Sequence, residues 1–355
     1  MTTRIDLRGL LPEELEELAA GLGEAPYRGR QIFHWLHRRL VTSLEEMTDL
    51  PRTFRERLGS RAVLPPVEVR NSLVADAGQT RKLLLRLVDG EMIECVLMSY
   101  KDGRQRQTAC LSSQVGCPMG CSFCATGQGG FRRNLTPGEI ILQALALVRE
   151  LQRQDPQARL SNIVFMGMGE PLLNYQAVLK AVRIFQYPGG WGISHRRITI
   201  STCGLVPQII RLAGEKPPPE LAVSLHAATN ELRERLMPVN RRYPLEDLIP
   251  ACRFYARETG RRVTFEYALI AGVNDRREDA RRLNELLRGV QAFVNLIPLN
   301  PIPESPGQGS SQERARLFAT WLQRGGLEAA VRESRGRDIA AACGQLRYST
   351  GGEVF

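Results

Sequence analysis

Apolar residues recur at helical spacing through the first 60 residues. Residues 11–23 carry Leu at intervals of three and four positions before a terminal Gly, and residues 27–40 continue the pattern. This spacing gathers apolar side chains on one face of an amphipathic helix. Shorter helices are predicted at 42–47 and 51–59, so the chain is expected to open with an all-helical unit.

The pattern changes to β-type runs over residues 66–99, and from about residue 107 runs of strand length alternate with helical patterns. The clearest helix follows Thr136, where Pro137 and Glu139 complete an amino-terminal capping box. Repeated βα units favour a parallel sheet, either open or closed as a barrel. The predicted strands are residues 107–112, 161–166, 196–201, 221–225, 263–269, 292–298 and 327–332. The other clear helices are predicted at 244–260, 277–289 and 311–326.

Small and polar residues follow four of these strands, in MGMGEP, STCG, SLHAA and PLNPIPE. In parallel α/β folds the active site lies at the carboxyl ends of the strands. Glycine there lets backbone amides approach a ligand, and Glu, Ser, His and Asn offer specific hydrogen bonds. The same residue types also form ordinary turns, but four such clusters in phase indicate a site.

Three cysteines lie in the loop after the first parallel strand, as Cys117, Cys121 and Cys124 in a C-x3-C-x2-C spacing. A structural zinc needs four ligands, usually from paired C-x2-C knuckles, and no second knuckle is present. A [4Fe–4S] cluster can use three thiolates and leave one iron open to a substrate. Zinc completed by Cys110 or Cys203 remains an alternative. Cys95 and Cys252 lie in apolar runs and are predicted to be core residues.

Composition adds a possible partner and a compartment. The 355 residues carry a net charge of +10, only four of the 48 basic residues are Lys, and the whole positive excess lies beyond residue 60. Arginine suits phosphate, so a nucleic-acid partner is one interpretation, and a solvated Arg-rich surface is the other. No apolar run approaches the roughly 20 residues of a membrane span, and the first residues do not form a signal peptide. We therefore expect a cytoplasmic protein with no membrane partner.

The cysteine spacing followed by GEP after the second parallel strand resembles the radical S-adenosylmethionine (SAM) superfamily. Five longer segments resemble its RlmN branch, the dual-specificity methyltransferases that modify carbon 2 of adenine in 23S rRNA and tRNA. The similarity extends over essentially the whole chain, including the helical amino-terminal part. The five segments are SSQVGC (112–117), MGMGEPLLN (166–174), SLHAAT (224–229), NLIPLNP (295–301) and DIAAACGQL (338–346).

The resemblance implies an α/β fold: a partial (βα)6-type radical SAM barrel with a small amino-terminal all-helical accessory domain and a β extension. It divides the chain into four parts. They are a helical RNA-binding domain (1–60), a β extension or linker (61–100), the partial barrel (101–335) and a carboxyl-terminal segment with the methyl-accepting cysteine (336–355).

The resemblance also implies the cofactors and their ligands. Cys117, Cys121 and Cys124 would hold one [4Fe–4S] cluster, and SAM would be used twice per turnover, as methyl donor and as radical source. The SAM contacts carried over from the family are Gly169, Glu170, Ser201, Ser224, Leu225, His226 and Asn300. Glu170 would accept from the SAM ammonium group, and Asn300 and the hydroxyls would reach its ribose or adenine.

Carbon 2 of adenine is electron-poor, so a displacement on SAM cannot methylate it, whereas a carbon radical can add to it. In the family mechanism Cys343 is methylated first, a hydrogen is removed from that methyl group, and the resulting radical adds to adenine, which tethers RNA to protein. Cys110 then attacks the sulfur of Cys343, forming a transient disulfide and releasing the product. Glu94 matches the proton acceptor, although its interval to Cys110 is slightly longer than the family's usual one; a solvated strand glutamate is the alternative.

The implied partners are 23S rRNA, tRNA and a flavodoxin- or ferredoxin-type electron donor, and we expect a monomer. Two rival functions stay open. One is a Cfr-type enzyme that methylates carbon 8 of adenine, although the proline of GEPLLN favours the carbon-2 branch. The other is a non-catalytic RNA-binding protein with a structural iron–sulfur or zinc site.

Overall fold

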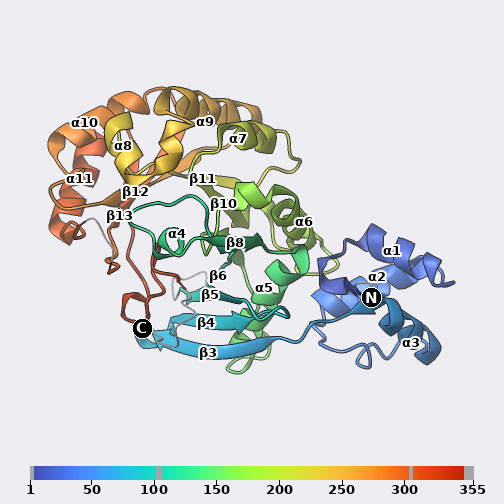
Figure 1. The fold of residues 1–355 in the computed structure, drawn as a ribbon. Helices are drawn as coiled ribbons and strands as arrows, with labels where there is room; N and C mark the ends of the chain where they lie inside the picture. Colours follow the sequence, from blue (N-terminus) through green and yellow to red (C-terminus); the bar gives the residue numbers. More distant parts are fainter. Residues whose placement is uncertain (1–3, 101–105, 304–306, 348–355) are drawn as a thin grey trace.

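The first part of the chain forms a small helical unit that extends to one side of the molecule (Figure 1). The structure is a computed structural model that describes residues 4–100, 106–303 and 307–347. The unit contains α1 (Pro12–Gly21), α2 (Tyr27–His37) and α3 (Arg52–Arg61), closed by the parallel pairing of β1 (Ile5–Asp6) with β2 (Ala62–Val63). The 3-10 turn η1 (Leu7–Gly9) packs against α5 (Pro137–Gln152), and so joins this unit to the rest.

The short helix predicted at 42–47 is wrong, because this segment forms turns and bends. The carboxylate of Glu46 accepts hydrogen bonds from the backbone N–H groups of Thr42 and Ser43 at 2.8 and 2.9 Å. These bonds satisfy the backbone locally without a helical turn. The other three predicted helices of this part are confirmed within a few residues.

The β extension is continuous with the main sheet. Strands β3 (Glu68–Ala75), β4 (Thr80–Arg86) and β5 (Met92–Ser99) form an antiparallel meander, and β5 pairs antiparallel with β6 (Gln107–Cys110). The expected linker therefore supplies three strands to a ten-stranded sheet in the order β14-β13-β12-β11-β10-β9-β6-β5-β4-β3. This continuity brings the extension to the edge of the barrel strands.

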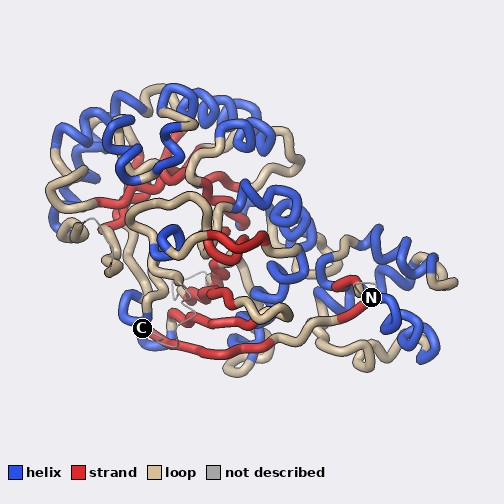
Figure 2. The backbone as a smooth tube through the Cα atoms, in the orientation of Figure 1, coloured by secondary structure: helices blue, strands red, loops and turns tan. Residues whose placement is uncertain are grey.

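Seven parallel strands form the barrel part, one more than a six-stranded unit, and all seven predicted strands are confirmed. Besides β6 they are β9 (Asn162–Phe165), β10 (Ile198–Thr202), β11 (Glu220–Ser224), β12 (Val263–Leu269), β13 (Ala292–Pro298) and β14 (Glu328–Val331). Helices cover their outer face (Figures 1 and 2). Besides α5, they are α6 (Tyr175–Gln186), α7 (Val206–Ala213), α8 (Asn230–Leu236), α9 (Leu245–Thr259), α10 (Arg277–Leu286) and α11 (Gln312–Arg324).

Side chains along β12 point alternately to the hydrophobic core under the helices and to the cavity inside the sheet. Phe265 and Tyr267 are fully buried on the helix side, where the Tyr267 ring stacks on Phe318 of α11 at 5.6 Å. Thr264 and Glu266, on the opposite face, line a cavity inside the curved sheet. Successive strand residues point to opposite faces, so each barrel strand contributes one row to the core and one to the interior.

The capping box predicted for the longest helix is confirmed. The Thr136 hydroxyl accepts from the Glu139 N–H at 3.2 Å, and the Glu139 carboxylate accepts from the Thr136 N–H at 2.8 Å. No helix in the described part of the chain combines the length and apolar character needed to cross a membrane.

Candidate active site

The three cysteines lie on a loop between the strands of a short hairpin, β7 (Gln114–Gly116) and β8 (Phe131–Asn134), which the sequence pattern did not predict. The Cys117 N–H donates to the Gly130 carbonyl at 2.8 Å, and Cys124 precedes the short helix α4 (Ala125–Gln128). The Ser122 N–H donates to the Leu236 carbonyl at the end of α8 at 3.0 Å. The loop is therefore fixed at both ends and in the middle.

The three thiols face one cavity, which Cys117, Cys121 and Cys124 all line. Burial raises the pKa of Cys117 to about 12, and the neighbouring Cys124 and Glu170 add to the increase. Within the described residues, no three His, Cys, Asp or Glu side chains converge closely enough to hold a single metal ion. A [4Fe–4S] cluster separates its thiolate ligands more widely than one zinc ion does and needs only three of them. Three thiols in one cavity match the number of protein ligands that a [4Fe–4S] cluster needs when one iron is left open to a substrate.

The same cavity gathers all but one of the predicted SAM contacts. It is lined by the three cysteines together with Gly169, Glu170, Ser201, Ser224, His226, Asn300 and Cys343. The predicted contacts lie at or just beyond the carboxyl ends of β9, β10, β11 and β13, as expected for parallel strands. The exception is Leu225, whose side chain is fully buried and whose N–H donates to the Glu266 carbonyl at 3.0 Å.

Gly169 occupies a position that only glycine tolerates. Its φ is +101°, and a Cβ atom there would lie 2.6 Å from Cβ of Gln114. Gln114 in turn accepts a hydrogen bond from the Glu170 N–H at 2.8 Å. The GEP turn is thus held against the strand that leads into the cysteine loop, and its backbone can approach a ligand closely.

The Glu170 carboxylate is buried and fixed by the backbone. It accepts from the Leu172 N–H at 2.9 Å and from the Cys203 N–H at 2.8 Å. Burial raises the pKa of Glu170, and the hydrogen bonds from Cys203 oppose the increase. Hydrogen bonds from the Cys203 and Thr202 side chains also reach this carboxylate, which lines the cavity.

His226 and Asn300 complete the cavity wall. Nδ1 of His226 accepts from the Ala268 N–H at 2.9 Å, and its ring packs edge-on against Phe123 of the cysteine loop at 4.7 Å. Burial lowers the pKa of His226 to about 3, so the ring is neutral. Asn300 donates to the Cys343 carbonyl at 3.2 Å, while its Oδ1 is buried and accepts from none of the described residues. That oxygen is suited to a donor on a bound ligand.

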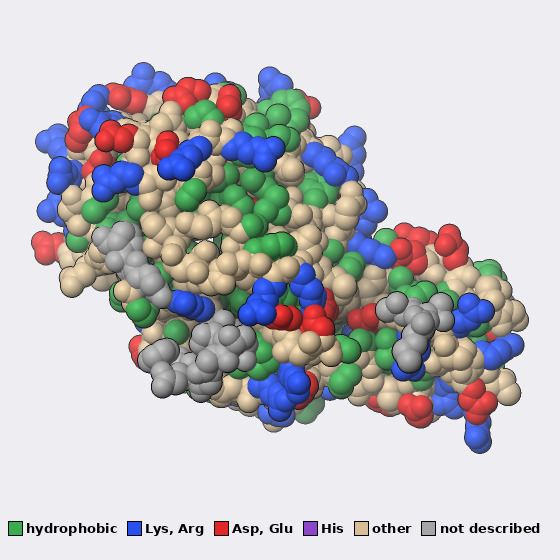
Figure 3. Space-filling model, viewed as in Figure 1, with side chains coloured by type: hydrophobic (Ala, Val, Ile, Leu, Met, Phe, Trp, Pro, Cys, Tyr) green, Lys and Arg blue, Asp and Glu red, His purple; other side chains and the backbone are tan. Residues whose placement is uncertain are grey.

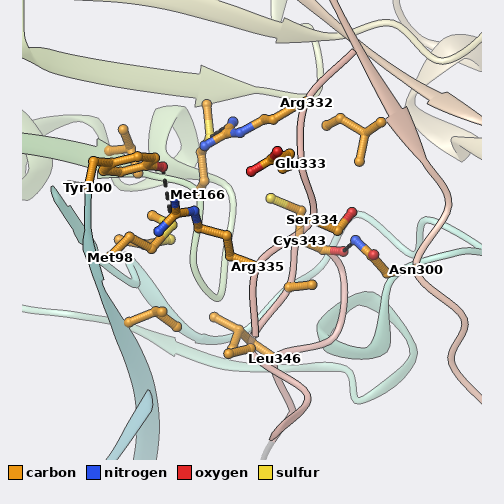
Figure 4. A pocket seen from close by; sticks show the side chains of 16 residues that line it. Met98, Tyr100, Met166, Asn300, Arg332, Glu333, Ser334, Arg335, Cys343 and Leu346 are labelled. Carbon is orange, nitrogen blue, oxygen red and sulfur yellow. Dashed lines mark hydrogen bonds between the residues drawn. The ribbon is translucent and has the colours of Figure 1, made fainter. Parts of the chain in front are cut away.

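A second pocket brings Cys110 and Cys343 together although they are 233 positions apart. Figure 4 shows Cys343 and Arg332 on one wall of this pocket, with Met98 and Tyr100 across from them. Both thiols are free. Burial raises the pKa of Cys110 to about 12, nearby Cys343 adds to the rise, and Arg332 opposes it. Cys343 is exposed yet also lines the cysteine-loop cavity, so it stands where the two cavities meet.

The Cys343 segment is held by hydrogen bonds from two sides. The Ala125 N–H of the cysteine loop donates to the Gly344 carbonyl at 2.7 Å, and Nζ of Lys82 on β4 donates to the Ala340 carbonyl at 3.2 Å. Of the predicted segment 336–355, residues 348–355 lie outside the described residues.

Glu94 lies on the same face of β5 as the residue paired with Cys110. Val96 pairs with Cys110, and Glu94 is two positions along the strand. Its carboxylate forms an ion pair with Lys82 at 2.8 Å and accepts from the Arg347 N–H at 2.8 Å. Burial raises the pKa of Glu94, and Lys82 opposes the increase. The solvated glutamate that was the alternative interpretation is wrong, because this side chain is 6% exposed.

Comparison with known proteins now identifies the family. The radical SAM superfamily model matches residues 111–283, and the model described as the ribosomal RNA large subunit methyltransferase N-terminal domain matches residues 5–64. A protein of Moorella thermoacetica named "Probable dual-specificity RNA methyltransferase RlmN" is 73% identical over 350 residues, covering 99% of each chain. The chain belongs to the RlmN family. A Heliobacterium modesticaldum protein of the same name is 50% identical over 98% of this chain and 91% of its own.

A solved relative agrees with the RlmN fold. The crystal structure of a radical SAM methyltransferase from Sphaerobacter thermophilus has a TM-score of 0.91 and 52% identity, covering 97% of this chain and 99% of that one. The α/β radical SAM fold expected from the sequence is therefore confirmed. Membership of this superfamily implies an iron–sulfur cluster and SAM, which agrees with the donors in the first cavity.

Several residues of the RlmN site were not predicted from the sequence. Lys82 binds Glu94, Arg332 lies beside Cys343, and Glu266 lines the cysteine-loop cavity from the middle of β12. A charged residue inside an otherwise mostly apolar strand was the available signal for Glu266, whereas Lys82 lies beside Arg81 in a strand with three charged residues and carried no such signal. Cys203 uses its backbone N–H to hold Glu170, and Cys95 and Cys252 are confirmed as core residues.

Proposed function

We propose that this chain methylates carbon 2 of adenine in 23S rRNA and tRNA by a radical SAM mechanism. The observation that carries the proposal is the position of Cys343, which lines both the cavity of the three cysteines and the pocket of Cys110. A methyl carrier must meet the radical source first and the resolving thiol afterwards. A residue shared by the two cavities meets both requirements.

Cys117, Cys121 and Cys124 would hold one [4Fe–4S] cluster, which when bound supplies the electron that cleaves SAM. The chain itself binds and orients SAM. The Glu170 carboxylate, which lines the cavity, accepts from the ammonium group, and the buried Oδ1 of Asn300 accepts from the adenosine part. Two SAM molecules are consumed per turnover, one as methyl donor to Cys343 and one as hydrogen acceptor.

The cysteine pair would perform the transfer and the release. Cys343 carries the methyl group, loses a hydrogen from it and becomes tethered to adenine. Cys110 then attacks the Cys343 sulfur to form the transient disulfide, which breaks the bond between that sulfur and the methylene carbon; this carbon keeps the electron pair and takes up a proton to become the methyl group of the product. Only a thiolate attacks efficiently, and the pKa of Cys110 is about 12 in the resting protein. Burial raises the pKa of both thiols, and Arg332 opposes this rise and so favours the reactive form.

Glu94 would accept the proton from carbon 2. Its strand position supports this role, because β5 lies directly beside the strand that ends in Cys110. Burial raises its pKa, which makes the carboxylate a stronger base toward the substrate proton. In this structure the Arg347 N–H binds Oε2 of Glu94 and Lys82 binds Oε1, so each carboxylate oxygen has one partner.

Arginines around the entrance to the cavity inside the curved sheet support an RNA substrate. Tyr100 has the guanidinium of Arg335 4.2 Å from its ring centre and that of Arg106 at 4.4 Å, and Arg332 lines the same cavity. Elsewhere basic and acidic side chains intermingle, as the face in Figure 3 shows over the helices of the barrel. Phosphate contacts would therefore concentrate at the entrance.

Three further parts of the proposal follow the sequence expectations. The chain has four parts, divided at about residues 60, 100 and 335, and residues 1–60 form the RNA-binding domain. This domain recognises RNA by shape, because it carries no net positive charge. The electron donor is a flavodoxin or ferredoxin. The protein acts as a monomer in the cytoplasm, where both RNA substrates are found.

Product analysis tests the proposal directly. Cluster-reconstituted protein is incubated anaerobically with methyl-labelled SAM and with rRNA and tRNA separately, and the nucleosides are identified by mass spectrometry. We expect 2-methyladenosine from both RNAs. Methyl at carbon 8 would instead establish the Cfr-type reaction. Labelled RNA produced by a Cys343→Ala variant would contradict the methyl-carrier mechanism, and a total lack of SAM cleavage would support the non-catalytic rival.

A further inference from the structure

The interior of the curved sheet contains a cavity lined by small side chains of four strands and by larger polar and charged side chains. Thr199, Ala222, Thr264 and Ala330 project into it from four parallel strands, β10, β11, β12 and β14. The cavity shares Val164, Met166 and Arg332 with the pocket of Cys110 and Cys343. A flat group that enters the barrel interior can therefore reach the two reactive cysteines.

One carboxylate in this interior has no part in the mechanism described above. Glu266 lies in the middle of β12, is 5% exposed, and lines both the barrel interior and the cysteine-loop cavity. It stands in a row across the sheet, between Ser224 on β11 and Asn295 on β13. A carboxylate removed from water costs free energy unless it is paired, so a buried glutamate at this position calls for a partner.

The two oxygens of Glu266 differ in their contacts. Oε1 accepts a hydrogen bond from Nδ2 of Asn295 at 3.0 Å, whereas Oε2 is buried and accepts from none of the described residues. Asn295 therefore fixes the side chain with one acceptor satisfied and one available. A buried acceptor without a donor costs free energy, which a donor on a bound ligand would recover. Burial raises the pKa of Glu266, and Arg332 opposes the increase.

Resting on the function proposed above, we propose that Oε2 of Glu266, oriented by Asn295, accepts a hydrogen bond from the exocyclic amino group of the target adenine. The amino group at carbon 6 is the donor that distinguishes adenine from hypoxanthine, which has a carbonyl there. The carboxylate therefore selects adenine in the barrel interior. It also fixes the rotation of the ring, and thereby determines which carbon faces Cys343.

The Gln variant tests this assignment because Asn295 determines how a glutamine would be oriented. In Glu266→Gln the Asn295 donor keeps the amide oxygen at the Oε1 position, and the NH2 group takes the place of Oε2. The variant then presents a donor where the wild type presents an acceptor. Adenine is rejected, while the carbonyl of hypoxanthine is accepted. A hydrogen-bonding group matched to one base edge discriminates by roughly tenfold to a hundredfold.

The experiment measures methylation of an RNA hairpin that carries adenosine, inosine or purine riboside at the target position. All three bases have a hydrogen at carbon 2, but purine riboside lacks any group at carbon 6. We expect the wild type to prefer adenosine to either analogue by roughly tenfold or more, and Glu266→Gln to reduce or invert the preference over inosine. Glu328→Gln removes the same charge from an exposed residue of β14 that is ion-paired with Arg262, and its preference should match the wild type.

Each outcome supports or overturns the assignment. A Glu266→Gln enzyme that keeps the wild-type ratio of adenosine to inosine overturns it. A loss of SAM affinity in equilibrium dialysis with an unchanged base ratio overturns it too, and shows that Glu266 serves SAM. If the Glu266→Gln variant does not fold, the wild-type enzyme still tests the assignment. Equal rates of methylation of the adenosine and purine riboside hairpins by the wild type would overturn it. Failure of the wild type to place methyl at carbon 2 of adenosine would refute the proposed function itself.

Discussion

The buried ion pair between Lys82 and Glu94 gives the sharpest test of the site. Nζ of Lys82 lies 2.8 Å from Oε1 of Glu94, and each side chain is only 6% exposed. Lys82→Met keeps the length of the side chain and removes its charge, which leaves Glu94 with the Arg347 N–H as its remaining partner. Removing one member of a buried pair costs roughly 3–5 kcal/mol of folding free energy while the other remains ionised.

The cost should depend on pH, because Glu94 can take up a proton. Burial already raises the pKa of Glu94 above 4.5, and loss of Lys82 raises it further. A group with a raised pKa in the folded state contributes its stability fully below the unfolded pKa, and loses it as the pH rises through the folded pKa. Lys82→Met should therefore be close to wild type in acid and destabilised in alkali.

Thermal unfolding of the reconstituted protein measures this dependence. At about pH 8.5 we expect the Tm of Lys82→Met to fall by roughly 5–10 °C, and at about pH 6 by much less. The double variant with Glu94→Gln is the control, and should recover most of the loss because no charge is left unpaired. If Glu94 accepts the substrate proton, the activity profile of Lys82→Met also shifts to higher pH. Equal Tm values for Lys82→Met and wild type at both pH values would refute the reasoning.

Five other outcomes are expected. Gly169→Ala places a Cβ atom 2.6 Å from Gln114 at a φ of +101°, and should weaken SAM binding in equilibrium dialysis by roughly tenfold or more, whereas Gly21→Ala, with no atom within 4 Å, should not. Cys343→Ala should abolish RNA methylation in the labelled-SAM assay. Cys110→Ala should instead accumulate a protein–RNA adduct on denaturing gels, and an adduct that is absent from this variant would argue against the resolving role. Because burial raises the pKa of Cys110 to about 12, the rate of adduct release in the wild type should rise about tenfold per pH unit below that value, as rapid-quench kinetics would show. RNA affinity in filter binding should fall steeply with salt, and a flat response would exclude phosphate contacts at the entrance.

Local patterns in the sequence predicted most of the fold. The seven parallel strands, the helix capped by Thr136 and Glu139, and the apolar faces of α1 and α2 follow from periodicity and capping, which depend on neighbouring residues. The helix predicted at 42–47 was wrong because the Glu46 carboxylate accepts hydrogen bonds from backbone N–H groups of this segment and stabilises turns instead. Hydrophobic periodicity does not reveal such bonds. The site at the carboxyl ends of the strands was predictable as well, since parallel strands bring their ends to one edge.

The sequence by itself thus determined the fold class and the chemistry that three closely spaced cysteines can support. Only the tertiary structure decided which distant residues meet. It joined the β extension to the barrel sheet, paired Lys82 with Glu94, and set Cys343 where the pocket of Cys110 meets the cavity of the cysteine loop. It also left one oxygen of Glu266 without a donor among the described residues. Such contacts arise from strand order and from packing between distant segments, and no local periodicity of the chain encodes them.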